Sequence, residues 1–277
     1  MISFTKAHAC GNDFLIVTEE AAGGRDRAEL TRRLCARNTG AGADGVEFFA
    51  WTNRSGPGPK SGRIRLHNAD GSIAEISGNG TRCVAAWMAE AVDARAGDTL
   101  EIETDAGIRA CHVNAVSAAG EFTADITTGM GVPEFAPRTV TIPGGVQVEG
   151  VAVSTGNPHF VIVVDNGEFS VDGQRWQSIG QQICGHPDFP CQTNVEFVRI
   201  ASASEIEIRI FERGVGPTTS SGTGTSASAT AAIALEGCAS PLRVVAPGGA
   251  QTVAWSGPGT ELYLTGPATL IARGEAW

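Results

Sequence analysis

A glycine-rich turn that runs directly into a helix occurs twice in this chain, and this pair constrains the fold most strongly. Residues 77–82 read Ser-Gly-Asn-Gly-Thr-Arg and precede the helical run 83–88, while residues 221–225 read Ser-Gly-Thr-Gly-Thr and precede the small-residue run 226–233. The N-terminus of a helix presents backbone N–H groups without intrahelical partners and the positive end of the helix dipole. Each turn therefore predicts a site for a carboxylate or a phosphate.

The second half of the chain repeats the first around these turns. Four short stretches return in the same order and at a nearly constant offset, which indicates the duplication of one supersecondary unit. The paired stretches are 11–17 with 156–163, 46–49 with 195–198, 64–65 with 208–209, and 77–80 with 221–224.

Each repeat is expected to be rich in strands around one helix. The helix over 227–235 is so small and apolar that it must be buried, so each half predicts a sheet wrapped around a central helix. The small polar stretch 115–121 marks the expected boundary between the halves. The other predicted elements are strands at 2–6, 13–17, 46–50, 63–68, 99–104, 107–114 and 122–127, a helix over 25–37, and a mobile turn over 53–62.

Composition excludes several classes of protein. A chain of 277 residues with 42% hydrophobic and 18% charged residues is typical of a globular protein with room for two domains. The net charge of −10, without a Lys/Arg-rich block, argues against a nucleic-acid partner. Neither a signal peptide nor an apolar run of about 20 residues is present, which predicts a cytoplasmic protein with seven free cysteines. Cys184 and Cys191 lack zinc-site spacing and are expected to be loop thiols.

Two anion sites related by a pseudo-twofold axis would face one cleft from opposite sides. Removing a proton next to a carboxylate and returning it on the other face needs two groups that flank one carbon. It also needs donors that stabilise the charge developing on the carboxylate. The duplicated turns meet both requirements, and they suit proton transfer at the α-carbon of an amino acid.

Seven motifs extend this interpretation over the whole chain. They lie at 11–14, 68–72, 78–83, 155–159, 193–197, 212–216 and 221–224. In this order they resemble the diaminopimelate epimerase family nearly end to end. The resemblance implies an α/β (α+β) fold of two pseudo-symmetric domains, each a mostly antiparallel sheet wrapped around a central helix. The implied lobes are 1–118 plus 265–277 and 119–264, with the substrate cleft between them and a last strand at 269–272 that returns to the first lobe.

The resemblance also implies an activity. The family interconverts LL- and meso-diaminopimelate by two-base proton transfer at the α-carbon, in lysine and peptidoglycan precursor synthesis. It needs no cofactor, neither pyridoxal phosphate nor a metal. The implied partner is a small amino-acid substrate rather than nucleic acid or a membrane, and a homodimer is expected by analogy only.

Carried over onto this chain, the resemblance assigns residue roles. Ser77 and Ser221 occupy the two acid/base positions, and His159 is expected to support one of them. Glu212 and Arg213 suit the distal amino and carboxylate groups of a zwitterionic diacid. The implied substrate-binding residues are Asn12, Asn68, Gly78, Asn79, Asn157, Asn194, Glu212, Arg213, Gly222 and Thr223.

Serine at both acid/base positions departs from the family, which has cysteine there. A thiol has a pKa of about 8.5 that a helix N-terminus lowers, whereas a serine hydroxyl is far less acidic and needs a neighbouring base. His159 would serve one side at most. Three explanations stay open: substitution in the laboratory, a natural branch that racemises or dehydrates another amino acid, and a relative that binds an amino acid without catalysis.

Several neighbouring residues have simpler interpretations. Cys10 and Cys83 lie inside the motifs but not at the acid/base positions, and they are expected to be small buried side chains. Asp44 and Asp70 lie in glycine-flanked loops and are expected to form turns. Arg82 has two interpretations, as a group that attracts a carboxylate or as the partner of a neighbouring acid.

Overall fold

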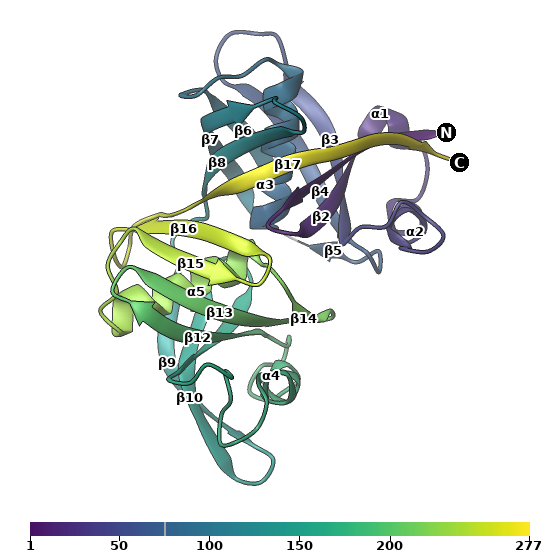
Figure 1. Ribbon diagram of the computed structural model, residues 1–277. Helices are drawn as coiled ribbons and strands as arrows, with labels where there is room; N and C mark the ends of the chain where they lie inside the picture. Colours follow the sequence, from purple (N-terminus) through teal and green to yellow (C-terminus); the bar gives the residue numbers. More distant parts are fainter. Residues whose placement is uncertain (75) are drawn as a thin grey trace. The chain divides into compact units, whose positions relative to one another are not determined.

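The computed structural model describes residues 1–74 and 76–277, which form two compact units (Figure 1). Unit 1 comprises Met1–Gly129 and Thr265–Trp277, and unit 2 comprises Met130–Leu264. The boundary therefore lies at 129/130 rather than at the expected 118/119. The reason is a strand over Phe122–Gly129, which pairs with the strand over Gly107–Ser117 and so continues the first sheet. None of the described helices combines the length and the apolar character of a membrane span.

Unit 1 is a closed ring of strands. Its members are β1 (Ile2–Ala9), β2 (Asn12–Thr18), β3 (Gly45–Asn53), β4 (Lys60–Asn68), β6 (Thr99–Thr104), β7 (Gly107–Ser117), β8 (Phe122–Gly129) and β17 (Leu262–Ala276). They pair in this order, and β17 closes the ring by pairing with both β8 and β1. The β2–β3 and β4–β6 pairs are parallel, whereas β1–β2, β3–β4, β6–β7, β7–β8 and β1–β17 are antiparallel.

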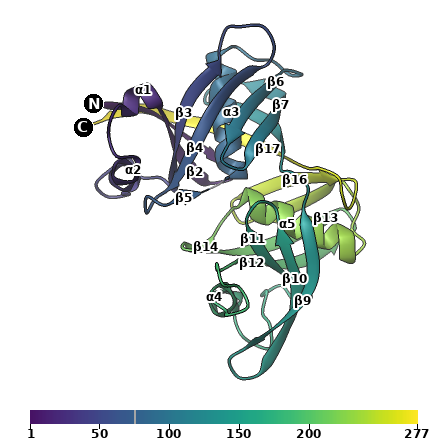
Figure 2. The same ribbon diagram turned by 180° about the vertical axis from the view of Figure 1, so that it is seen from behind.

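The helix α3 (Gly78–Ala91) fills this ring. In the two opposite views, β17 passes in front of α3 on one side and β4 lies in front of it on the other (Figures 1 and 2). Val84, Ala85 and Met88 are fully buried on the helix. Each larger apolar side chain contributes about 1.5–3 kcal/mol by leaving water. The short elements of the unit are α1 (Glu19–Ala22), α2 (Arg27–Cys35) and β5 (Ile73–Ala74).

Unit 2 repeats this pairing scheme. Its strands are β9 (Glu134–Ile142), β10 (Val146–Ser154), β11 (Pro158–Val164), β12 (Asn194–Ser202), β13 (Glu205–Glu212), β14 (Gly216–Thr218), β15 (Leu242–Ala246) and β16 (Gly249–Trp255). Five successive pairs in unit 2 alternate between antiparallel and parallel: β10–β11, β11–β12, β12–β13, β13–β15 and β15–β16. The same alternation occurs in unit 1 along β1–β2, β2–β3, β3–β4, β4–β6 and β6–β7. The predicted duplication is therefore present in the hydrogen-bonding of the sheets.

The central helix of unit 2 is α5 (Gly222–Leu235), and α4 (Trp176–Cys184) packs against β12 and β13. Serine, threonine and alanine make up most of α5, and two of its buried hydroxyls bond back onto the helix. Ser226 Oγ donates to Gly222 O at 2.9 Å and Thr230 Oγ1 donates to Ser226 O at 2.9 Å. Such bonds to the preceding turn satisfy hydroxyls that have no access to water.

The sequence predicted these elements with shifted bounds. The helix expected over 25–37 is α2, which begins and ends inside that range, and β4 already begins at Lys60 within the expected turn. The strand expected over 269–272 is the long β17, whose pairing with β1 confirms its return to the first unit. Cys184 ends α4 and is buried rather than lying in a loop, whereas Cys191 is exposed.

Candidate active site

Each central helix begins at one of the two predicted serines. Ser77 is the N-cap of α3 and its Oγ accepts a hydrogen bond from Gly80 N at 3.0 Å. Ser221 is the N-cap of α5 and its Oγ accepts from Gly224 N at 3.2 Å. A serine cap stabilises a helix by about 1 kcal/mol, and it leaves the hydroxyl proton available to another acceptor.

A buried glutamate lies against the first turn of each central helix, and it explains the second glycine of each motif. A Cβ added to Gly80 would lie 2.1 Å from Glu47 Oε1 and 3.2 Å from Ser77 Cβ. A Cβ added to Gly224 would lie 2.7 Å from Glu196 Oε1 and 3.3 Å from Ser221 Oγ. Both glutamates are fully buried on central strands of their sheets. Only glycine leaves room for the carboxyl group at these two places.

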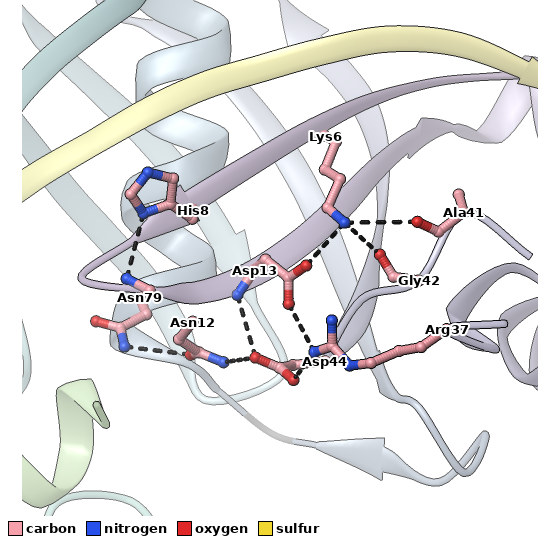
Figure 3. Close-up of polar contacts among 10 residues, drawn as sticks. Lys6, His8, Asn12, Asp13, Arg37, Ala41, Gly42, Asp44 and Asn79 are labelled. Carbon is pink, nitrogen blue, oxygen red and sulfur yellow. Dashed lines mark hydrogen bonds and ion pairs between the residues drawn. The ribbon is translucent and has the colours of Figure 1, made fainter. Parts of the chain in front are cut away.

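The unit 1 site contains a chain of amide side chains (Figure 3). Arg82 Nη2 donates to Asn79 Oδ1 at 2.5 Å, and Asn79 Nδ2 donates to Asn12 Oδ1 at 3.2 Å. Asn12 Nδ2 in turn donates to Asp44 Oδ2 at 2.7 Å. Arg82 is fully buried and holds the Asn79 side chain from inside the unit, which favours a positioning role for Arg82. The chain fixes the orientation of two predicted substrate-binding amides.

Asp44 belongs to an ionic cluster at the start of β2 and β3 (Figure 3). Arg37 Nη2 contacts Asp44 Oδ1 at 2.7 Å and Asp13 Oδ1 at 3.0 Å, and Lys6 Nζ lies 2.9 Å from Asp13 Oδ2. Burial by itself would raise the pKa of Asp13, but hydrogen bonds from Arg37 and Lys6 outweigh it and hold this pKa below its usual value. Asp44 is therefore more than the turn former that the sequence predicted. Asp70 does form a turn, because its Oδ1 accepts from Ser72 N at 2.8 Å.

The unit 2 site connects four predicted residues. His159 Nε2 lies 2.9 Å from Asn157 Oδ1, and Asn157 Nδ2 donates to Thr223 Oγ1 at 3.4 Å. Thr223 Oγ1 lies 3.5 Å from Ser221 Oγ. On its other side, His159 Nδ1 lies 2.8 Å from Glu196 Oε1, and both side chains are fully buried. A continuous set of polar contacts thus joins the serine to a carboxyl–imidazole pair.

His159 Nδ1 and Glu196 Oε1 are close enough for a proton to pass between them. Asn157 Oδ1 is an acceptor, so His159 Nε2 carries a hydrogen. Nδ1 then either accepts a proton from a neutral Glu196 or donates one to the carboxylate. In both cases a hydrogen lies between Nδ1 and Oε1, and the contacts through Asn157 and Thr223 connect this pair to the Ser221 hydroxyl, as acid/base chemistry through that hydroxyl requires.

The remaining predicted residues lie near these two hydrogen-bonded series of side chains. Asn194 begins β12, where its Nδ2 donates to Pro158 O at 3.1 Å and its Oδ1 accepts from Arg213 N at 2.9 Å. Glu212 is the last residue of β13, directly before Arg213. Asn68 ends β4 opposite Gly45, and its Nδ2 donates to Ser72 Oγ at 3.1 Å. Among residues 1–74 and 76–277, no hydrogen bond joins Asn68 to Ser77 or Asn12.

Two further observations concern the surroundings of the site. Cys83 is fully buried, and burial raises the pKa of its thiol well above the usual value, in agreement with the expected inert side chain. A cavity of about 720 Å³ lies in unit 1 near the end of α3 and is lined by residues such as Glu90 and Arg273. No predicted site residue lines this cavity, so it is not part of the candidate site.

Comparison with known proteins matches nearly the whole chain to one protein family. A model of the diaminopimelate epimerase family matches residues 4–135 and 151–271. A diaminopimelate epimerase from Aromatoleum aromaticum is 35% identical over 286 residues, which covers 99% of this chain and 98% of the relative. The diaminopimelate epimerase from Carboxydothermus hydrogenoformans is 34% identical over 290 residues, with 99% of each chain covered.

Solved structures share the fold at low sequence identity. A hydroxyproline epimerase from Agrobacterium vitis, solved with trans-4-hydroxy-L-proline, superposes with a TM-score of 0.71 at 15% identity and covers 99% of this chain and 90% of its own. A phenazine biosynthesis protein from Bacillus anthracis superposes with a TM-score of 0.69 at 17% identity, covering 100% and 99%. The predicted architecture of two sheets, each wrapped around a helix, is confirmed.

Proposed function

The chain belongs to the diaminopimelate epimerase family of isomerases, and we propose that it interconverts LL- and meso-diaminopimelate by moving a proton at the α-carbon. Ser77 and Ser221 would be the groups that exchange this proton, one on each face of the carbon. The observation that supports the proposal most directly is the duplicated site itself. Each serine caps a buried helix N-terminus and lies beside a buried glutamate.

The helix N-termini suit the charge that the reaction creates. When the α-proton leaves, its electron pair moves from the α-carbon onto the carboxylate, whose negative charge increases. The first turns of α3 and α5 offer backbone N–H groups and the positive end of the dipole to such a group. Asn79 and Thr223 flank the turns as side-chain donors, and Asn12 and Asn157 are held next to them.

The serine hydroxyls need help to act as bases, because their acidity is far below that of a thiol. On the unit 2 side, polar contacts connect Ser221 to the hydrogen-bonded pair of His159 and Glu196. Ser221 Oγ would take the α-proton while passing its own proton to this pair, and the reverse sequence would return a proton. The cleft between the lobes, in which both serines would reach one carbon, stays a prediction of the sequence.

Incubation of LL-diaminopimelate with the protein in D₂O tests the proposal. Proton NMR at the α-carbon should show loss of the α-proton signal together with formation of the meso isomer. The variants S77C and S221C, made together, place a thiol at each cap and should raise the rate by at least tenfold. The double variant S77A/S221A should show neither exchange nor inversion.

Serine at the two positions where the sequence analysis expects cysteine favours one further candidate, a protein that binds diaminopimelate without turnover. Calorimetric binding with no exchange in the wild type, and restored exchange in S77C/S221C, would assign this role. Exchange and inversion of a different amino acid, with none for diaminopimelate even in S77C/S221C, would overturn the substrate assignment.

A further inference from the structure

Glu47 is a buried carboxyl group that has no partner in unit 1. Its residue is fully buried, and among residues 1–74 and 76–277 neither carboxyl oxygen has a hydrogen-bond partner. An unpartnered buried carboxyl group is costly to a fold, so its presence calls for an explanation. Glu47 lies in β3 between the apolar residues Val46 and Phe48, where packing alone would be satisfied by another hydrophobic side chain.

The position of Glu47 is the same as that of Glu196 in unit 2. In the parallel β2–β3 pair, Glu47 lies opposite Ile16, and in the parallel β11–β12 pair, Glu196 lies opposite Val161. Both carboxyl groups touch the second glycine of the turn that begins the central helix. In unit 2 this carboxyl group works with His159, whereas the corresponding residue in unit 1 is Phe14.

The carboxyl group lies close to the serine cap. The point 2.1 Å from Glu47 Oε1, where Gly80 would carry a Cβ, is 3.2 Å from Ser77 Cβ. Ser77 Oγ accepts from Gly80 N, so its own proton is free to point toward another acceptor. The Ser77 side chain and the Glu47 carboxyl group thus lie against the same point of Gly80.

We propose that Glu47 is the proton reservoir of the unit 1 site and acts on the substrate through Ser77. When unit 1 removes the α-proton, the Cα–H bond breaks and its proton binds Ser77 Oγ. The former Ser77 proton moves to the Glu47 carboxylate, and the electron pair stays on the α-carbon and spreads into its carboxylate. When unit 1 returns a proton, the same steps run backwards. The inference rests on the proposed function and names the group that replaces a missing histidine.

The environment brings the pKa of Glu47 close to neutral pH, so that its carboxyl group can both accept and release a proton. Burial raises the pKa of its carboxyl group from 4.5 to about 8, because the charged form would lie in apolar surroundings. Leu66 lies opposite Glu47 on β4, and the neighbouring His67 packs against the Phe48 ring on the other face. On α3, the buried thiol of Cys83 interacts electrostatically with Glu47, and Arg82, Cys10 and Asp13 act on the same thiol.

Carbon-13 NMR of protein with labelled glutamate side chains tests the link between Glu47 and Ser77 without reference to activity. The carboxyl resonance that disappears in E47Q should titrate with a midpoint near pH 8. In S77A the midpoint should rise by about one pH unit, because the Ser77 hydroxyl can no longer turn to donate to the carboxylate when Glu47 ionises. S77T should restore the wild-type midpoint, and S221A, the matched change in unit 2, should leave it unchanged.

Two outcomes of this titration would overturn the proposal. The first is an identical midpoint in the wild type and in S77A. The second is a shift in T81V but not in S77A, which would assign the donor to Thr81, a buried hydroxyl without a partner among the described residues.

Deuterium incorporation provides the second readout. In E47Q, inversion of LL- and meso-diaminopimelate should fall at least tenfold, while one of the two isomers still exchanges its α-proton through the unit 2 face. E47D keeps the carboxyl group and should retain more inversion than E47Q. An equal loss of exchange for both isomers would mean that Glu47 only supports the fold. No exchange in the wild type would defeat the proposed function, and the titration would still decide whether Glu47 and Ser77 are coupled.

Discussion

Phe14 and His159 hold the same position in the two halves of the chain. Each lies on the strand that begins the parallel pair, Phe14 opposite Gly45 and His159 opposite Asn194. The duplication therefore preserved the buried glutamates, Glu47 and Glu196, but gave only one of them an imidazole partner. The two proton-transfer sites are equivalent in backbone and different in chemistry.

Replacing the imidazole of His159 should lower the free energy of unfolding, because the buried Glu196 carboxyl group loses its partner. H159F leaves the Glu196 carboxyl group buried without its partner, and the free energy of unfolding should fall by about 3 kcal/mol. Urea denaturation followed by circular dichroism measures this change. The matched variant H112F alters an exposed histidine and should stay within about 0.5 kcal/mol of the wild type. Equal stability of H159F and H112F would contradict the tight pairing.

The second glycine of each motif should tolerate no side chain. G80A places a methyl group against Glu47 Oε1, and G224A does so against Glu196 Oε1, so each should destabilise the protein by about 1–3 kcal/mol. G167A is the control, because a Cβ at that position meets no heavy atom within 4 Å. Thermal unfolding of the three variants would show the contrast, and a neutral G80A would place the carboxyl group elsewhere.

The stability of the protein should depend on pH through Glu47. Its pKa is about 8 in the folded chain and near 4.5 in the unfolded chain, so the folded state holds the proton more tightly. Stability from this group is fully present below pH 4.5 and is lost as pH rises toward 8. Relative to E47Q, the wild type should therefore lose at most about 1.4 kcal/mol per pH unit in this window.

Urea denaturation of the wild type and E47Q at pH 5.5, 6.5 and 7.5 measures that slope. The other titrating groups are common to both proteins and cancel in the difference. A stability difference that stays constant from pH 5.5 to 7.5 would show that Glu47 has an ordinary pKa.

Asp44 should matter for substrate binding more than for stability. D44N removes the carboxylate that orients Asn12 and pairs with Arg37, so the KM for diaminopimelate should rise about tenfold, equivalent to about 1.4 kcal/mol. D105N is the matched control, because Asp105 also loses one exposed ion pair, with Arg65 at 3.6 Å. Steady-state kinetics would distinguish the two, and a similar KM in both variants would argue against the role of Asn12.

Much of the fold could be predicted from the sequence, because turns, helix starts and repeated strands depend on residues that are close together in the chain. The serine and glycine turns predicted the start of α3 and of α5, and the repeated stretches predicted two units with the same strand pairing. Side-chain contacts are not local. Asn12 meets Asp44 across 32 residues and Asn79 across 67, and no period in the sequence encodes such pairs.

The two buried glutamates leave a signal in the sequence, but this signal does not indicate their role. The repeated Val-Glu-Phe stretches place a charged residue at the same point of two apolar strands, which is unusual for a buried strand. The role of the two carboxyl groups becomes visible only in the folded protein, where the first turns of α3 and α5 lie against them. Arg82 is a similar case, because only the folded chain shows that it contacts Asn79.

The return of β17 to unit 1 determines when the first unit can be completed during synthesis. The ring around α3 lacks one strand until Thr265–Trp277 has left the ribosome, although Met1–Gly129 emerges first. Unit 2 is continuous in sequence, so nearly all of it is available for folding earlier. The half of the protein that is translated first therefore waits for the last residues of the chain.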